Sequence, residues 1–108
     1  MSIARIRELN DEFRSSPQRH GRLMVTSGVN ELGAAFVEKA ICSACTFDEF
    51  TEDNDPHGER DFGRFVLEGE TLFWKIDYYG KKMEYGSEDP ADPTKTTRVL
   101  TIMLAEEY

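Results

Sequence analysis

The residues that could do chemistry are concentrated between positions 48 and 61, in the segment DEFTEDNDPHGERD. Carboxylates and an imidazole are the donor groups of hydrolytic metal sites, and here they come from Asp53, Asp55, His57 and Asp61. This set defines one hypothesis, a small metal-dependent hydrolase or nuclease. The simpler interpretation is a solvated turn in which Arg60 pairs with its acidic neighbours, because loops rich in acids, proline and glycine are common connections.

The same segment matches a twelve-residue calcium loop only in part. Asp53, Asp55 and Gly58 take positions 1, 3 and 6 of that pattern,. Position 12 holds Arg64, where the pattern requires a bidentate glutamate, and this cation would repel calcium,. We therefore do not expect an EF-hand site.

The negative charge of the protein is concentrated in two segments. Residues 48–61 (the first acidic segment) carry seven acids and one base, and residues 84–92 (the second acidic segment) carry four acids and no base. The whole chain has a formal net charge of −8, so the rest of it is slightly basic. A concentrated negative field indicates attraction of a basic partner, whereas a sequence pI of about 4.7 argues against direct binding to nucleic acid or anionic lipid,.

Other motifs for catalysis or cofactor binding are missing from the sequence. The chain has no GxSxG and no Walker-type loop, and GVNELG at 28–33 lacks the spacing of a nucleotide fingerprint,. Cys42 and Cys45 form a CSAC pair without a second ligand pair for zinc and without the strand before a helix that redox chemistry needs,. We expect these thiols to pack in the core, and we expect no cofactor. These observations favour a non-enzymatic protein over an enzyme.

Hydrophobic periodicity predicts the elements that position the acidic segments. Apolar residues at helical spacing predict helices over 2–15 and 32–45,. Asp92 followed by Pro93 resembles a helix start and predicts a last helix that carries the apolar run Val99 to Leu104,. Strands are predicted over 21–26 and 46–51 and, most clearly, as a hairpin of 62–68 and 71–79 with Gly69 in its turn,. The core face of this hairpin should be Leu72, Trp74, Ile76 and Tyr78.

This order of elements predicts a single α+β domain over residues 1–108, with an antiparallel sheet of three or four strands, a central β-hairpin and about three helices,. No run of about 18 apolar residues could span a membrane, and the N-terminus lacks the apolar core of a signal peptide,. We therefore expect a cytoplasmic protein without a membrane partner. The sequence does not indicate an oligomeric state.

Four segments, NDPHGERDFG, FWKIDYYG, EYGSEDPADP and TRVLTIMLAEEY, together resemble a bacterial family known only as a domain of unknown function. The GRLMVTSGV segment and the helix after it also fit, and the C-terminal half is the most specific part. Members are short acidic proteins that are often carried on plasmids and in phage-like regions. The resemblance supplies no catalytic residues, but this setting implies a counter-defence role by analogy.

The favoured hypothesis is an inhibitor that blocks the basic, nucleic-acid-binding surface of another protein, as an anti-CRISPR or anti-restriction DNA mimic does. Tyrosines beside acids are typical of interfaces, in which rigid rings serve as anchors. The hypothesis requires the two acidic segments to share a face of the fold. The expected partner-binding residues are Asp48, Glu49, Glu52, Asp53, Asp55, Glu59, Asp61, Tyr79, Glu84, Tyr85, Glu88 and Asp89.

Overall fold

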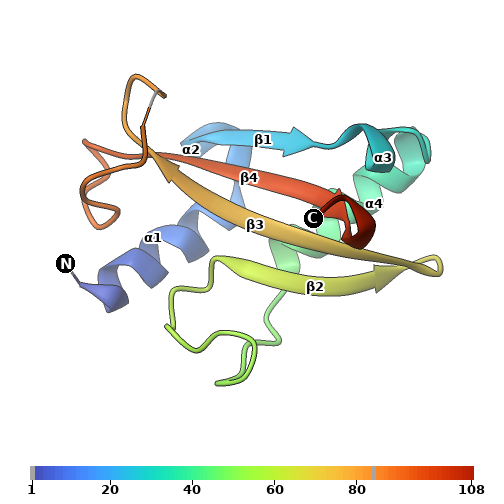
Figure 1. Ribbon diagram of the computed structural model, residues 1–108, viewed down its shortest axis with the longest axis horizontal. Coiled ribbons are helices and arrows are strands. Elements are labelled where there is room, and N and C mark those ends of the chain that lie inside the picture. The colour runs from blue at the N-terminus through green and yellow to red at the C-terminus, as the bar shows by residue number, and fades with distance from the viewer. Residues whose placement is uncertain (1, 84) are drawn as a thin grey trace.

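A computed structural model of the protein describes residues 2–83 and 85–108 (Figure 1). A four-stranded sheet with the order β1-β4-β3-β2 lies at its centre. β2, β3 and β4 pair in antiparallel fashion, whereas β1 runs parallel to β4. The α+β class is thus confirmed, and the antiparallel sheet is corrected to a mixed one. The strands are β1 (Arg22–Val25), β2 (Phe62–Leu67), β3 (Glu70–Tyr79) and β4 (Thr97–Leu104).

The predicted hairpin is confirmed as β2 and β3, with Leu67 opposite Glu70 in the register. Glu68 and Gly69 form its two-residue turn, and both have positive φ, 51° and 83°. This is the backbone conformation of the turns that match the twist of a hairpin, and glycine adopts it without strain. The turn therefore sets the register that puts Trp74 on the core face.

The predicted last helix is wrong, because residues 97–104 form β4, an inner strand of the sheet. This strand is buried on both faces and is therefore apolar on both faces, and that pattern resembles a buried helix,. Leu100 and Ile102 are fully buried, and Val99 on the other face is 3% exposed. Asp92 does not cap a helix. Its Oδ1 accepts hydrogen bonds from the amide and the hydroxyl of Thr94, at 2.9 and 2.6 Å, and so closes a local turn,.

The two long helices are close to their predicted positions. The Ser2 side chain caps the first by accepting the amide hydrogen of Arg5 at 3.2 Å,, and the second begins at Ala34 rather than at 32. Two short helices and a final 3₁₀ turn were not predicted. The helical elements are α1 (Ile3–Ser15), α2 (Pro17–His20), α3 (Ser27–Asn30), α4 (Ala34–Thr46) and η1 (Ala105–Glu107). In the part of the chain that the structure describes, no helix combines the length and apolar character needed to cross a bilayer.

The strand predicted over 46–51 is also wrong. Phe47 and Phe50 both turn inward onto Trp74, with ring centroids 5.6 and 6.1 Å from that indole. The Phe47 carbonyl accepts a hydrogen bond from Arg14 at 2.8 Å instead of a bond from a neighbouring strand. Burial of aromatic surface therefore decides the path of this segment.

The core lies between one face of the sheet and the helices α1 and α4. The predicted hairpin face is confirmed, since Leu72, Trp74 and Ile76 are buried and Tyr78 packs against the same cluster. Residues from α1 and α4 complete it, among them Phe13, Phe36, Ala40 and Ala44. Figure 1 looks onto the opposite face of the sheet, where the ring of Tyr108 packs against the rings of Phe62 and Phe73.

Candidate functional site

Both acidic segments lie at the same end of the sheet (Figure 1). The first leads into the start of β2, and the second lies in the connection from the end of β3 to the start of β4. The antiparallel pairing places these three strand ends together. In Figure 1 the two connections lie on either side of α1, so the segments share an end of the molecule but do not form one continuous loop cluster.

Side chains of α1 fix the backbone of the first acidic segment. Arg7 and Asn10 donate hydrogen bonds to the carbonyls of Gly58 and Glu59, at 3.2 and 2.9 Å. Asp11 and Arg60 form an ion pair at 3.0 Å between the helix and the segment. These contacts join α1 to residues about 50 positions later in the chain. They hold the first acidic segment against the domain.

The first acidic segment also bonds to itself. The Asn54 carboxamide accepts the Thr51 amide hydrogen at 2.7 Å and donates to the Glu49 carbonyl at 2.8 Å. Asp55 Oδ1 accepts the amide hydrogen of Arg60 at 3.1 Å. These are the side-chain-to-backbone bonds of compact turns. Asp55 therefore has a structural role within the segment.

The seven acids of this segment divide into two groups by exposure. Glu59 is half-buried, and its Oε1 accepts the Tyr78 hydroxyl at 2.9 Å. Asp61 is half-buried as well, and burial, followed by the nearby Glu59 carboxylate, raises the pKa of Asp61 above its ordinary value,. The carboxylates left free at the surface are those of Asp48, Glu49, Glu52 and Asp53, which are all exposed.

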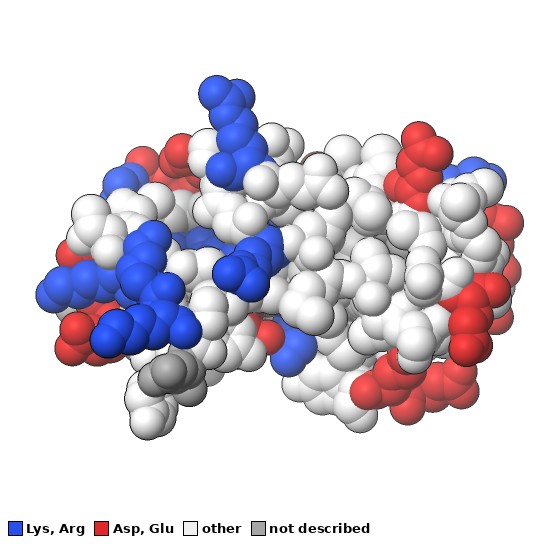
Figure 2. Space-filling model, turned by 90° about the horizontal axis from the view of Figure 1, so that it is seen from above, with Lys and Arg blue, Asp and Glu red and all other residues white. Residues whose placement is uncertain are grey.

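The second acidic segment contributes less to a negative surface than its composition indicates. Tyr85 and Glu88 are exposed, but Tyr79 is half-buried, and Asp89 accepts the Ala91 amide hydrogen at 3.1 Å in a local turn. Glu84 lies outside the described residues. The flanking lysines Lys81, Lys82 and Lys95 are exposed, and Figure 2 shows blue and red side chains mixed at this end of the molecule. Of the two segments, the first therefore carries more of its negative charge at the surface.

A buried polar network, which the sequence did not predict, lies between the two segments. Asn10 is fully buried, donates to the Tyr78 hydroxyl at 2.8 Å and accepts a hydrogen bond from Arg98 Nε at 2.7 Å. Arg98 also donates to the Pro90 carbonyl, at 2.6 Å. Burial raises the pKa of Tyr78 and lowers that of Arg98, because each charged form loses its hydration,. The network thus connects both acidic segments to α1.

Asn10 had a signal in the sequence, because it occupies the buried stripe of α1 with Ile6 and Phe13. A polar side chain on an apolar stripe indicates a satisfied buried amide. Arg98, which is 88 positions away, gave no signal of its own. Its partners become visible only when β4 is placed beside β3 and α1.

Arg14 is a second buried arginine, and it closes the C-terminal end of α4. Its Nη1 donates to the carbonyls of Ala44 and Phe47, both at 2.8 Å. Its guanidinium lies 4.6 Å from the Trp74 ring centroid, within cation–π distance,. Burial lowers the pKa of Arg14, and the role of this side chain is to join α1, α4 and the core.

The candidate metal ligands do not converge. Asp53 and His57 are exposed, Asp61 is half-buried, and Asp55 is engaged with the Arg60 amide. Within residues 2–83 and 85–108, no group of three or more His, Cys, Asp and Glu side chains is arranged to hold a metal ion. The hydrolase alternative therefore gains no geometric support.

The cysteines are only partly as expected. Cys45 is half-buried, and burial raises the pKa of its thiol. Cys42 is exposed, so the expectation of core packing is wrong for this residue. It falls on the outer side of α4, because Ala40 and Ala44 take the positions that face the core.

The chain was compared with known protein families, with curated proteins and with solved structures. Residues 25–107 match a family described as "Protein of unknown function (DUF3768)". The match includes every strand except the first residues of β1, and it leaves α1 and α2 outside its range. Comparisons with curated proteins and with solved structures found no match. The chain belongs to the family of proteins of unknown function DUF3768.

Proposed function

We propose that this protein is a non-enzymatic inhibitor that docks the first acidic segment onto a basic, nucleic-acid-binding surface of another protein in the bacterial cytoplasm. The observation that carries the proposal is a set of exposed carboxylates in a segment that side chains of α1 hold near both ends, at the carbonyls of Phe47, Gly58 and Glu59, and that Asn54 bonds to itself in between. These carboxylates are those of Asp48, Glu49, Glu52 and Asp53. Ordered acids lose little conformational entropy on binding. Their field accelerates encounter with a basic partner and makes that encounter sensitive to salt.

The charge of the segment sets the size of the contact. Seven acids and one base give residues 48–61 a net charge of −6. Duplex DNA carries one charge per about 1.7 Å, so the segment replaces about 10 Å of duplex, or roughly three base pairs. A contact of this size needs apolar anchors in addition to charge. Tyr85, a residue that is 79% exposed at the same end of the sheet, is the best-placed anchor.

The proposed biological setting is counter-defence. A nuclease that cuts invading DNA has a basic groove, and an acidic protein that fills this groove would protect the invader. The resemblance to proteins carried on plasmids and in phage-like regions supports this setting by analogy. Anti-CRISPR and anti-restriction DNA mimics are therefore the class of inhibitor that we propose.

A capture experiment with two charge-matched variants tests the proposal. The loop variant replaces the four exposed acids of the segment: Asp48→Asn, Glu49→Gln, Glu52→Gln and Asp53→Asn. The control variant changes the net charge equally with Glu31→Gln, Glu38→Gln, Glu70→Gln and Glu106→Gln, all at exposed positions outside the two acidic segments. Each tagged protein is incubated with bacterial lysate at low and at high salt. Captured proteins are identified and purified for a DNA-displacement assay.

The proposal expects the native protein and the control variant to capture a DNA-binding protein at low salt and to displace DNA from it. High salt should abolish capture by the native protein, and the loop variant should capture nothing even at low salt. Capture that survives in the loop variant would contradict the role of the segment. Equal loss in both variants would show that net charge alone, rather than a located surface, is responsible.

A further inference from the structure

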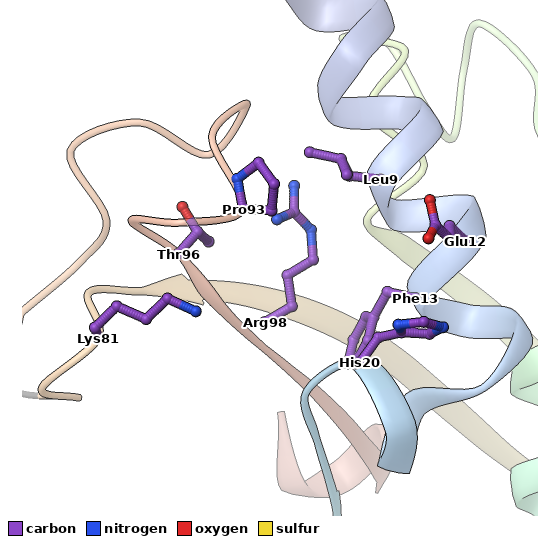
Figure 3. Close-up of a pocket in the computed structure, with 8 residues that line it drawn as sticks. All are labelled: Leu9, Glu12, Phe13, His20, Lys81, Pro93, Thr96 and Arg98. Atoms are coloured by element: carbon purple, nitrogen blue, oxygen red, sulfur yellow. The ribbon is translucent and has the colours of Figure 1, made fainter.

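A cavity of about 130 Å³ lies between α1, α2 and the connection that precedes β4 (Figure 3). Leu9 and Phe13 of α1 and Pro93 of the connection supply its apolar walls. Its polar lining comes from four separate parts of the chain: Glu12, His20, Lys81, Thr96 and Arg98. Liquid water occupies about 30 Å³ per molecule, so the cavity has room for a group of phosphate size and a few more atoms.

Arg98 is the unusual member of this lining, because its charge is buried without a counter-ion. The residue is 5% exposed, and in the described part of the chain no carboxylate lies within ion-pair distance of it. Its acceptors are the neutral oxygens of Asn10 and Pro90, and its guanidinium lies 5.1 Å from the Tyr78 ring centroid. Buried charges in proteins are normally paired, because loss of hydration is costly. An anion in the cavity would supply the missing partner.

Lys81 adds a second positive charge to the lining. Figure 3 shows its side chain extending toward the aliphatic stem of Arg98, whereas Glu12 and His20 line the opposite wall from α1 and α2. By formal charge, Arg98, Lys81 and Glu12 give the lining +1, in a protein whose formal net charge is −8. The local field therefore has the opposite sign to that of the whole molecule, and it favours an anion.

We propose that this cavity binds a small oxyanion, a phosphate or a carboxylate group, through Arg98 and Lys81. Arg98 supplies a guanidinium that is already positioned by Asn10, and arginine is suited to bidentate bonds with either oxyanion. Glu12 stands on the far wall, so the part of the ligand nearest to it is neutral or cationic. This site is separate from the exposed acids of the first acidic segment and does not depend on the proposed docking function.

The test uses inorganic phosphate and acetate as probes, each titrated into the full chain at constant ionic strength and pH 7. Thermal unfolding measures the stabilisation that a bound ligand produces, and amide NMR shifts near Thr96 and Arg98 locate the site. A probe that binds should raise the melting temperature and shift these amides with the same saturable dependence on concentration. Saturation by phosphate alone assigns a phosphate ligand, and saturation by acetate assigns a carboxylate.

Neighbouring lysines provide the matched control. Lys81→Met should weaken binding of the active probe roughly threefold to fivefold, the upper part of the range for an exposed charge interaction, whereas Lys82→Met should leave it unchanged, because Lys82 does not line the cavity. Glu12→Gln should tighten phosphate binding, and Glu8→Gln should have no effect. Arg98→Met should weaken binding more than tenfold. If that variant does not fold, the comparison of Lys81→Met with Lys82→Met still tests whether the cavity binds the probe.

Three results would overturn the proposal. The first is the absence of a saturable response to both probes. The second is an equal effect of Lys81→Met and Lys82→Met. The third is a set of NMR shifts that saturates elsewhere on the molecule.

Discussion

Replacing Asn10 with leucine would test whether the buried polar network holds the two acidic segments to α1. Leucine has the same branched skeleton of side-chain heavy atoms, so the loss counted here is that of three hydrogen bonds, two donated and one accepted from Arg98. Neutral bonds contribute about 1 kcal/mol each and a bond from a charged group about 1.5–3 kcal/mol, so Asn10→Leu should lower the free energy of unfolding by about 3.5–5 kcal/mol. Domains of this size have only about 5–15 kcal/mol in total.

Urea unfolding followed by the fluorescence of Trp74, the single tryptophan of the chain and a fully buried one, measures this loss. Asn30→Leu is the matched control, because Asn30 is exposed and its replacement should change stability by less than about 0.5 kcal/mol. Tyr78→Phe alone should cost about 2.5–4 kcal/mol, because it removes a neutral bond from Asn10 and a bond to the Glu59 carboxylate,. The double variant should cost less than the sum of the two single variants, because the two side chains share a hydrogen bond,. A loss below about 1 kcal/mol for Asn10→Leu would refute the reasoning.

Two further predictions concern the sheet and its C-terminal end. Hydrogen bonds, first of all from the Thr26 hydroxyl, hold the pKa of Glu107 below its ordinary value, so its stabilising effect is present at neutral pH and is lost as the pH falls through that lowered pKa. Urea midpoints measured from pH 7 to pH 2 should therefore show Glu107→Gln about 1 kcal/mol less stable at pH 7, with a gap that closes in acid, whereas Glu106→Gln should show no such gap. Gly63→Ala should cost about 1–3 kcal/mol in the same assay, because a Cβ at this buried position would collide with the Trp74 indole. Gly80→Ala, where the nearest atom outside the adjacent residues is 3.6 Å away, should cost much less, and equal losses would contradict the packing argument.

Much of the fold could be predicted because local patterns agree with the final packing. The β2–β3 hairpin carries its turn residues and its alternating face within one short stretch, and α1 carries its cap and its apolar stripe. The strand β4 could not be distinguished from a helix, because a strand covered on both faces loses the alternation that identifies strands. The Asp92–Pro93 pair reinforced the error, since an aspartate that closes a turn has the same sequence signature as one that caps a helix.

The acidic composition of the candidate site could be predicted from the sequence. Which of its acids are structural and which are free at the surface could not. Sequence shows which residues are acidic, but only the fold shows that Asp55 and Glu59 bond within the domain while Asp48 and Asp53 remain free. The cavity beside Arg98 was not predictable, because its lining comes from segments that the β4 error had separated. When an inner strand such as β4 is predicted as a helix, none of the contacts that it makes with its neighbours can be predicted.

The strands of this sheet cannot pair in the order in which they are synthesised. β1 must wait through the synthesis of residues 26–96 for its partner β4, whereas β2 and β3 can pair as soon as both have left the ribosome. During this interval the β3 edge is unpaired, and the core cluster around Leu72, Trp74 and Ile76 lacks the apolar side chains that β4 contributes to it. Exposed apolar surface and open strand edges are what chaperones bind and what drives aggregation. Chains that terminate early, between residues 80 and 96, should therefore accumulate as insoluble or chaperone-bound fragments rather than as partly active protein.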